Sequence, residues 1–273
     1  MMSTTSRPEP TTEPTDAGAG VPVLEARGIV KRFGHVEALR GADFTVHKAE
    51  VVALIGDNGA GKSTLIKTLS GVHAPDEGEI RVNGRPVRFS TPVDARQAGV
   101  ETVYQDLAVA DDLTVAANLY LGREILRSGP LGRLGLLDKR AMRRGATEAL
   151  SQLGVRVPRV TTPIAMLSGG QRQSVAVARA IIWATNVVIL DEPTAALGVV
   201  QTERVLDVVR RARDAGMSVV LVSHNMPQVL EVADRVEVLR LGRRAARFQA
   251  DQATTDDLVA AMTGARATQT EEP

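Results

Sequence analysis

The sequence predicts an α/β fold with a mostly parallel β-sheet and helices on both of its faces. Three short apolar segments contain no charged residue, as is typical of strands buried in such a sheet. They are residues 51–55, 187–190 and 219–222. Segments with apolar residues at helical spacing lie between them, and this alternation of strands and helices favours parallel strands.

Two amphipathic helices are expected beside these strands. The first follows residues 51–55 and ends near Gly71, and the second ends near Gly216, just before residues 219–222. Glycine often closes a helix because it adopts the left-handed backbone conformation without strain. The apolar faces consist of Leu65, Ile66 and Leu69 in the first helix, and of Val205, Val208, Val209 and Ala212 in the second.

Two regions depart from this alternation. From about residue 106 to 170 we expect an α-helical subdomain inserted into the core, because Asp138 can cap a helix that Gly154 closes. Nearer the N-terminus, residues 79–82 followed by Asn83-Gly84 are a hairpin signal and predict an antiparallel β portion. The helix has the apolar face Met142, Ala146, Leu150 and Leu153, and an irregular connection marked by Gly129, Gly132 and Gly135 precedes it.

The domain expected from these elements is a single unit from residue 23 to 264, with a disordered tail at each end. Residues 3–20 contain no Val, Leu, Ile or Phe, so they cannot bury enough apolar surface to offset their ordering entropy. The tails comprise residues 1–22 and 265–273.

Composition narrows the possible functions. Lys and Arg number 33 against 32 Asp and Glu, a balance that gives no electrostatic case for a nucleic-acid partner. The absence of cysteine excludes disulfides and fits a reducing cytosol. No apolar run approaches the roughly 18 residues of a membrane helix, and the first 20 residues lack the apolar stretch of a secretory signal. If this chain works at a membrane, we expect another protein to span it.

A phosphate-binding loop lies between the first strand and its helix, where the sequence fits GxxxxGK[ST]. Its glycines let successive backbone N–H groups converge on phosphate oxygens at a helix N-terminus. Lys62 would reach the β and γ phosphates, and the Ser63 hydroxyl would bind magnesium. A glycine-rich turn beside a surface lysine is the alternative, but the strand–loop–helix context favours a nucleotide site. The expected contacts are Gly56, Asp57, Asn58, Gly59, Ala60, Gly61, Lys62, Ser63 and Thr64.

An acidic pair, Asp191-Glu192, follows the second apolar strand at its carboxyl end, where open α/β sheets bind ligands. Asp191 suits a magnesium contact. Glu192 can orient and polarise a water molecule towards the γ-phosphate. Such a pair alone often marks only a strand leaving the core, but a phosphate loop in the same chain favours the catalytic interpretation.

A second anion-binding turn, Leu167-Ser168-Gly169-Gly170-Gln171, precedes an amphipathic helix. By itself this segment also fits an ordinary capped helix. Its distance from the acidic pair is more specific, because the 24 positions from Leu167 to Asp191 hold one helix of about four turns and then the acidic strand.

Together these motifs resemble the ATP-binding cassettes of ABC transporters, whose signature motif is similar to residues 167–171 and precedes an Asp-Glu-Pro-Thr like residues 191–194. The resemblance covers residues 23 to about 264 and implies a P-loop NTPase core whose α-helical subdomain bears the signature motif. It implies ATP and Mg²⁺ as cofactors. It also implies that ATP lies between residues 56–64 of one chain and Ser168, Gly169, Gly170 and Gln171 of a second copy.

The same resemblance assigns three further roles. Phe33 takes the position that stacks on adenine, Gln105 the position that touches magnesium and the attacking water, and His224 the position that faces the γ-phosphate. Their alternatives are a core aromatic residue, a surface amide and a structural histidine. The chain departs from the family at Gly198, where Asp is usual in a loop that crosses between cassettes, and this affects communication between sites.

Residues 101–107, 113–118 and 121–124 resemble importers of the ribose, xylose and fructose type in their single-cassette form. This implies a homodimer on transmembrane permease subunits at the cytoplasmic face of the plasma membrane, served indirectly by a sugar-binding protein. The alternative is a soluble ABC ATPase acting on ribosomes or nucleic acid, but such proteins typically have two cassettes or long coiled-coil insertions. A regulatory binder without turnover would be expected to lack Lys62, Glu192 or His224, and all three are present.

Overall fold

The computed structural model describes residues 20–105, 108–195 and 197–265 and contains two sheets. The four-stranded sheet is antiparallel, with the order β2-β1-β4-β5, and confirms the expected N-terminal β portion. Its hairpin turns at Asn83 and Gly84, which have φ angles of 50° and 73°. The strands are β1 (Leu24–Phe33), β2 (Val36–Val46), β4 (Glu77–Val82) and β5 (Arg85–Val87).

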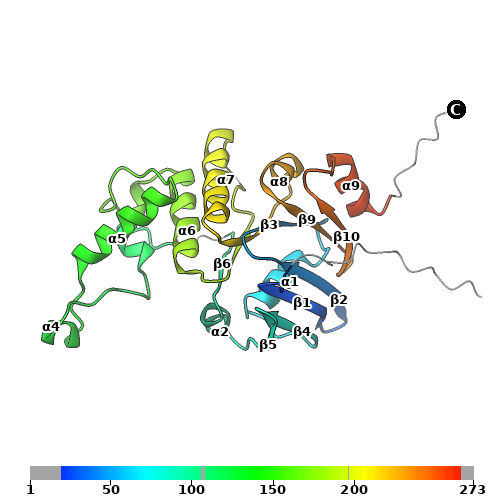
Figure 1. Cartoon of the computed structure of the whole chain (residues 1–273), viewed down its shortest axis with the longest axis horizontal. Helices are drawn as coiled ribbons and strands as arrows, with labels where there is room; N and C mark the ends of the chain where they lie inside the picture. The colour runs from blue at the N-terminus through cyan, green and yellow to red at the C-terminus, as the bar shows by residue number, and fades with distance from the viewer. Residues whose placement is uncertain (1–19, 106–107, 196, 266–273) are drawn as a thin grey trace, which may run out of the picture.

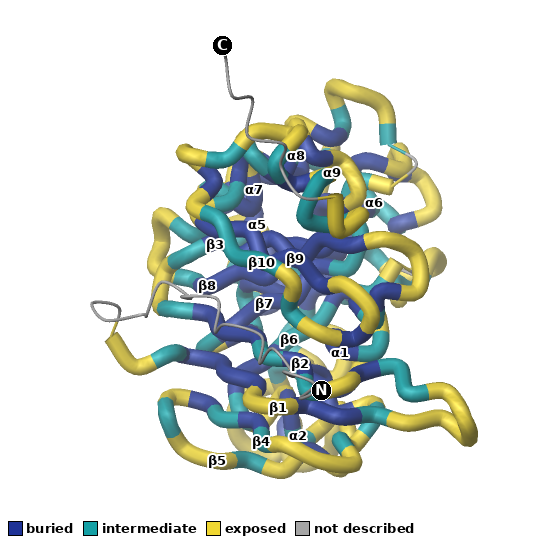
Figure 2. The backbone as a smooth tube through the Cα atoms, turned by 90° about the vertical axis from the view of Figure 1, so that its right-hand side faces the viewer, coloured by how far each residue is buried: buried dark blue, intermediate teal, exposed yellow. Residues whose placement is uncertain are grey.

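The six-stranded sheet has the order β10-β9-β3-β8-β7-β6 and is parallel except for the edge strand β10. This confirms the predicted α/β fold. Three of its strands are the apolar segments read from the sequence, and Figure 2 shows them buried near the middle of the molecule. The strands are β3 (Val51–Ile55), β6 (Val100–Val103), β7 (Val187–Asp191), β8 (Ser218–Val222), β9 (Arg235–Arg240) and β10 (Arg243–Gln249).

Helices cover both faces of this sheet (Figure 1). On one face, α1 (Lys62–Leu69) packs between the two sheets, where its Leu65 and Ile66 share a core with Phe44 of β2. On the other face, α7 (Val199–Asp214) packs through its predicted apolar stripe. The remaining helices outside the inserted subdomain are α2 (Pro92–Gln97), α8 (Met226–Val232) and α9 (Thr255–Thr263).

The predicted helical subdomain lies to one side of the sheets (Figure 1). The Asp138 carboxylate accepts a hydrogen bond from the Ala141 N–H at 2.9 Å, so it caps its helix as expected. A short helix, α4, occupies the connection that the sequence marked only as irregular. The helices are α3 (Val115–Leu119), α4 (Pro130–Arg133), α5 (Lys139–Gln152), the 3₁₀ turn η1 (Ile164–Met166) and α6 (Gly169–Trp183).

A buried charged cluster joins the two sheets. The Arg235 guanidinium of β9 donates to the Thr45 carbonyl of β2 at 2.7 Å and to the Glu50 carboxylate at 2.8 Å. It also pairs with Glu237, whose carboxylate accepts from Arg247 Nε at 2.9 Å. Burial raises the pKa of Glu237 and the surrounding arginines oppose that rise. Removing one partner would leave a buried charge uncompensated, so the cluster holds the sheets together.

Most of both expected tails falls outside the described residues, and the domain bounds of 23–264 stay a prediction. None of the helices in the described ranges is long and apolar enough to cross a bilayer.

Candidate functional site

The phosphate loop runs from β3 into α1, as predicted, and its backbone requires glycine. A Cβ atom on Gly56 would lie 2.2 Å from the Leu239 carbonyl oxygen, and one on Gly61 would lie 2.7 Å from the Ala38 oxygen. Gly61, the N-cap of α1, has a φ of 104° and forms no side-chain cap. The first turn of α1 therefore keeps backbone N–H groups that can bind an anion.

The Lys62 side chain folds back over this loop. Its Nζ donates hydrogen bonds to the carbonyl oxygens of Gly56 at 2.7 Å and Asp57 at 3.1 Å. Burial lowers the pKa of Lys62, while the nearby Glu192, Asp57 and Asp191 carboxylates oppose that shift. The ammonium group thus lies at the centre of the loop, against its backbone oxygens.

The acidic pair reaches the same pocket from β7. Burial raises the pKa of Asp191, the Glu192 carboxylate raises it further, and Lys62 opposes the rise. Glu192 has a φ of 51°, in the left-handed region that non-glycine residues seldom occupy. Its N–H donates to the Val222 oxygen at 3.0 Å, so this unusual backbone is held by β8. Such outliers tend to cluster at functional sites.

His224 completes the cluster. It follows β8, and its Nε2 lies 2.6 Å from Glu192 Oε1. The pocket that holds Lys62, Asp191, Glu192 and His224 has a volume of about 460 Å³. The structure thus brings together most of the predicted residues, and lining side chains include Asp57, Asn58, Ala60, Ser63 and Thr64.

Seven of the expected contact residues lie outside this lining: Gly56, Phe33, Gln105 and the four residues of the signature turn. Gln105 is exposed in the segment after β6. Phe33 is 44% exposed, and its ring meets the His73 ring edge-on at 5.2 Å between centroids. The signature turn, residues 168–171, begins α6, where the Ser168 hydroxyl accepts from the Gln171 N–H at 3.3 Å, and it borders a different pocket. Within one chain the phosphate loop and the signature turn are not brought together.

One wall of the pocket was not predicted from the sequence. It is supplied by β2 through Val36, Glu37, Ala38 and Arg40. This wall is attached to the phosphate loop through Gly242, in the β9–β10 turn. The Gly242 N–H donates to the Ala60 oxygen at 2.9 Å, and its oxygen accepts from the Arg40 N–H at 2.9 Å. Only the Leu241-Gly242 turn itself could have been recognised from local sequence.

The oxygen donors in the pocket suit magnesium. The described residues contain no group of three or more His, Cys, Asp or Glu side chains placed to hold a metal ion. Magnesium bound with nucleotide typically uses one or two carboxylates, with phosphates and water completing its shell. Asp191 and the Ser63 hydroxyl in the phosphate-loop pocket fit that pattern.

Gly198 is the N-cap of α7, and its φ of −73° is open to any residue. It forms no side-chain cap, while its oxygen accepts from the N–H groups of Gln201 and Thr202. The Asp usual in the family at this position would be a good N-cap, so glycine leaves α7 without that stabilisation. Ala196, in the same loop, lies outside the described residues.

Known proteins match over the same region. The family described as ABC transporter matches residues 39–195. The chain is 52% identical over 247 residues to the fructose import ATP-binding protein FrcA of Rhizobium meliloti, covering 90% of this chain and 95% of that protein. It is 42% identical over 241 residues to the xylose/arabinose import ATP-binding protein XylG of Sulfolobus acidocaldarius. That match covers 88% of this chain and 94% of XylG.

A solved structure gives the same result for the fold. The ADP conformation of an ATP-binding cassette of an ABC transporter superposes with a TM-score of 0.75 at 25% identity, covering 89% of this chain and 95% of that one. The family match spans more than half of the chain, and it includes the phosphate loop, the signature turn and the acidic pair. The chain is a member of the ABC transporter family, and its fold is that of the ATP-binding cassette.

Proposed function

We propose that this chain binds and hydrolyses ATP to energise an ABC importer of a monosaccharide. The observation that carries the proposal is the gathering of Lys62, Asp191, Glu192 and His224 around one pocket at the phosphate loop. A cation, a metal-binding carboxylate and a carboxylate able to act as a base are the groups that phosphoryl transfer to water needs.

Binding of ATP follows from the loop. Residues 56–64 offer N–H groups of the α1 N-terminus to the phosphates, and Lys62 neutralises the terminal ones. Ser63 and Asp191 would hold Mg²⁺, with Gln105 as a further oxygen donor, and the ion would offset the negative charge of the phosphates. Phe33, which is 44% exposed, would stack on adenine.

Hydrolysis is the role proposed for Glu192. Its carboxylate would accept a proton from the attacking water and orient that water towards the γ-phosphate. His224 Nε2 contacts the carboxylate at 2.6 Å, so it can hold Glu192 in position. The left-handed backbone at Glu192 supports this assignment, because it directs a carboxylate to the pocket at a cost in strain.

A second copy of the chain would complete the site. The signature turn has N–H groups at the start of α6 but lies apart from the phosphate loop of its own chain. In a two-fold dimer each signature turn would face the partner's phosphate loop, giving two equivalent sites. ATP between them would close the dimer.

Monosaccharide import is supported by the relatives. FrcA is named for fructose import and XylG for xylose and arabinose import, and the chain spans nearly the full length of both. We infer transmembrane permease subunits, a sugar-binding protein outside, and a peripheral position on the cytoplasmic face of the plasma membrane. These relatives do not favour the alternative of an ATPase acting on ribosomes or nucleic acid.

The permease is proposed to dock where β6 leads into the helical subdomain, just after Gln105. Asp106 and Leu107 of this segment lie outside the described residues, whereas residues 108–112 are described. Cross-linkers placed at residues 108–112 in membranes that hold the whole complex should capture a permease loop. Capture only from the opposite face of the cassette would contradict this arrangement.

Reconstitution tests the whole proposal. The chain is combined with candidate permease and sugar-binding proteins in proteoliposomes supplied with ATP, and uptake of labelled fructose, xylose and ribose is measured. We expect uptake of at least one sugar with the wild type and none with Glu192→Gln. A chain that hydrolyses ATP but never associates with the permease would refute the import role while leaving the ATPase assignment intact.

A further inference from the structure

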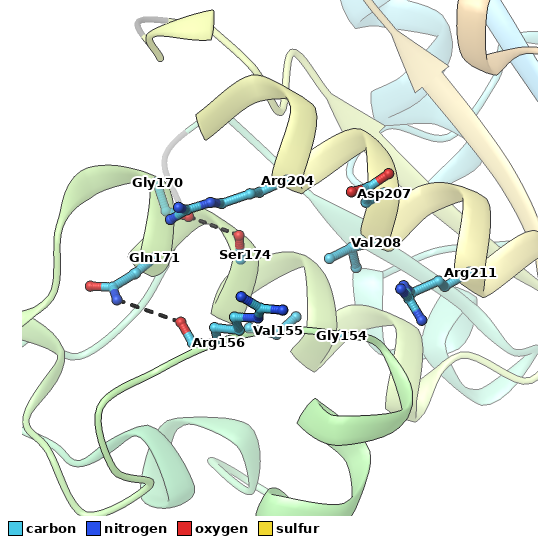
Figure 3. Close-up of a pocket in the computed structure, with 10 residues that line it drawn as sticks. All are labelled: Gly154, Val155, Arg156, Gly170, Gln171, Ser174, Arg204, Asp207, Val208 and Arg211. Carbon is cyan, nitrogen blue, oxygen red and sulfur yellow. Dashed lines mark hydrogen bonds between the residues drawn. The ribbon is translucent and has the colours of Figure 1, made fainter. Parts of the chain in front are cut away.

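A second pocket, with a volume of about 260 Å³, lies between α6, α7 and the turn that follows α5. It shares no lining residue with the phosphate-loop pocket. Its walls are residues 154–156, the first two turns of α6 and one face of α7 (Figure 3). Gly170 and Gln171 of its lining belong to the signature turn proposed to contact ATP, whereas the proposed ATP site uses none of its other lining residues.

Three guanidinium groups line this pocket, from Arg156, Arg204 and Arg211. Figure 3 shows Arg204 extending from α7 towards Gly170. Within the described part of the chain, none of the three guanidinium groups forms an ion pair or hydrogen bond. Arg210 and Arg213, on the same helix, are both paired with carboxylates, so they are already engaged in a way that the three pocket arginines are not.

The charge of the pocket is therefore positive. Asp207 is the acidic side chain in its lining, and Asp207 Oδ1 already accepts a hydrogen bond from Arg210 Nη1 at 2.8 Å. The N-terminus of α6 adds the positive end of a helix dipole. Within the described residues the three guanidinium groups have no anionic partner, and the Asp207 carboxylate is already bonded to Arg210. The pocket is therefore complementary to a negatively charged ligand.

Backbone contacts keep the pocket in shape. Gly154 has a φ of 68°, and a Cβ there would lie 2.8 Å from Arg211 Nε, so the glycine leaves the room that Arg211 occupies. The Gln171 amide donates to the Arg156 oxygen at 3.5 Å, which links the start of α6 to the turn after α5. Arginines from two separate segments are thus positioned around one space.

We propose that this pocket binds a small anion that carries phosphate. The planar guanidinium group matches phosphate oxygens with two parallel hydrogen bonds and is weakly hydrated, so its transfer from water is less costly than that of an ammonium group. The volume suits a small molecule rather than a polymer. Because the pocket contacts α6 and α7 together, a bound anion would join the signature helix to the helix that follows the acidic pair.

Calorimetry with inorganic pyrophosphate tests the site in the full-length chain. Lys62→Ala removes the main cation of the phosphate loop, and magnesium is omitted at low ionic strength. We expect saturable binding at one site per chain in this background. Adding either Arg204→Gln or Arg211→Gln should weaken binding by about tenfold or more. Adding Asp207→Asn should strengthen it a few-fold, because a negative charge leaves the pocket.

The matched control is Arg243→Gln, which removes the same charge from an exposed position on β10. It should leave the affinity within about twofold, whereas long-range attraction alone would make all arginine changes equivalent. Absence of binding in the Lys62→Ala chain, or equal weakening by the control, would overturn the proposal. If Lys62→Ala does not fold, the wild type is titrated with its phosphate loop saturated by ADP. Pyrophosphate should then still bind, and the Arg204 and Arg211 changes should still weaken it.

Discussion

The His224 imidazole and the Glu192 carboxylate are in direct contact, with Nε2 2.6 Å from Oε1. The side chains are 45% and 27% exposed, so water can reach both. The Glu192 N–H is bonded to Val222, two residues before His224. The pair is therefore built on β7 and β8 and keeps its geometry as long as those strands stay together.

Replacing Glu192 with Gln should separate binding from hydrolysis. The amide keeps the shape of the side chain but cannot accept the proton of the attacking water, so turnover should fall by about 10²-fold or more. ATP binding should remain, and an ATP-bound dimer should accumulate on size-exclusion chromatography. Glu148→Gln, an exposed change on α5, serves as the control and should hydrolyse ATP normally. Near-normal turnover in Glu192→Gln would remove this residue from the mechanism.

Mixed dimers test whether the site is shared between chains. Lys62→Ala damages the phosphate loop, and Gly169→Asp brings a carboxylate to the signature turn, where a Cβ has open space around it. Each variant alone should be inactive. In the mixed dimer both defects fall in the same site if completion is in trans, so the other site is native and ATPase activity should return.

This outcome requires exchange of subunits and turnover by one intact site. Heterodimers are verified with two affinity tags, and phosphate release is measured before and after mixing. Dimers of wild-type and Lys62→Ala chains show independently whether one native site turns over. If those dimers are active and the doubly defective mixture is not, the shared site is wrong.

Asp191→Asn should stabilise the nucleotide-free chain at neutral pH. Burial and then Glu192 raise the pKa of Asp191, so the folded chain holds this proton to a higher pH than the unfolded chain does. The resulting stabilisation is present in acid and is lost as the pH rises from the ordinary aspartate value through the raised one. At about pH 7 the variant should melt above the wild type, and the gap should close as the pH falls to about 4, the ordinary aspartate pKa.

Melting curves of both proteins across this pH range test whether Asp191→Asn raises or lowers the melting temperature. The same variant should gain less stability from magnesium and nucleotide, because it has lost a metal-binding oxygen. A variant that melts below the wild type at neutral pH would show that ionised Asp191 stabilises the empty pocket.

Gly56→Ala should destabilise the chain more than Gly59→Ala. Both positions have positive φ, which costs a non-glycine residue about 1 kcal/mol or more. At Gly56 the new Cβ would also lie 2.2 Å from the Leu239 oxygen, whereas at Gly59 it would have nothing within 4 Å. This overlap should add about 1–3 kcal/mol to the loss of unfolding free energy. Equal losses in urea titrations would mean that the loop moves to accept the methyl group.

Local features of the sequence were sufficient for much of the fold. Residues 51–55 are all buried, as the uninterrupted run of apolar residues without a charge predicted. Asn83-Gly84 is a turn because both residues tolerate positive φ. The phosphate loop and the acidic pair could likewise be found from spacing, since each lies at the end of a recognisable strand.

Other parts of the site depend on contacts between distant segments. The wall supplied by β2, with Glu37 and Arg40, is placed by pairing of the N-terminal strands and by the bonds that the β9–β10 turn makes to β2 and the phosphate loop. Local sequence patterns do not reveal these long-range contacts. Gln105 was expected at the metal, but it is exposed and outside the pocket lining. To reach the metal this side chain would have to move, and local spacing does not reveal such a movement.

Gly242 has a consequence for the thermodynamics of nucleotide binding. Its N–H donates to the Ala60 oxygen of the phosphate loop, and its oxygen accepts from the Arg40 N–H of β2. This single residue therefore bridges the two walls and fixes the spacing between them. A Cβ at this position would lie 2.8 Å from the Ala38 oxygen, which leaves little room for the spacing to change. These two walls are thus held at a fixed spacing before ATP enters, so ATP binding does not have to order them.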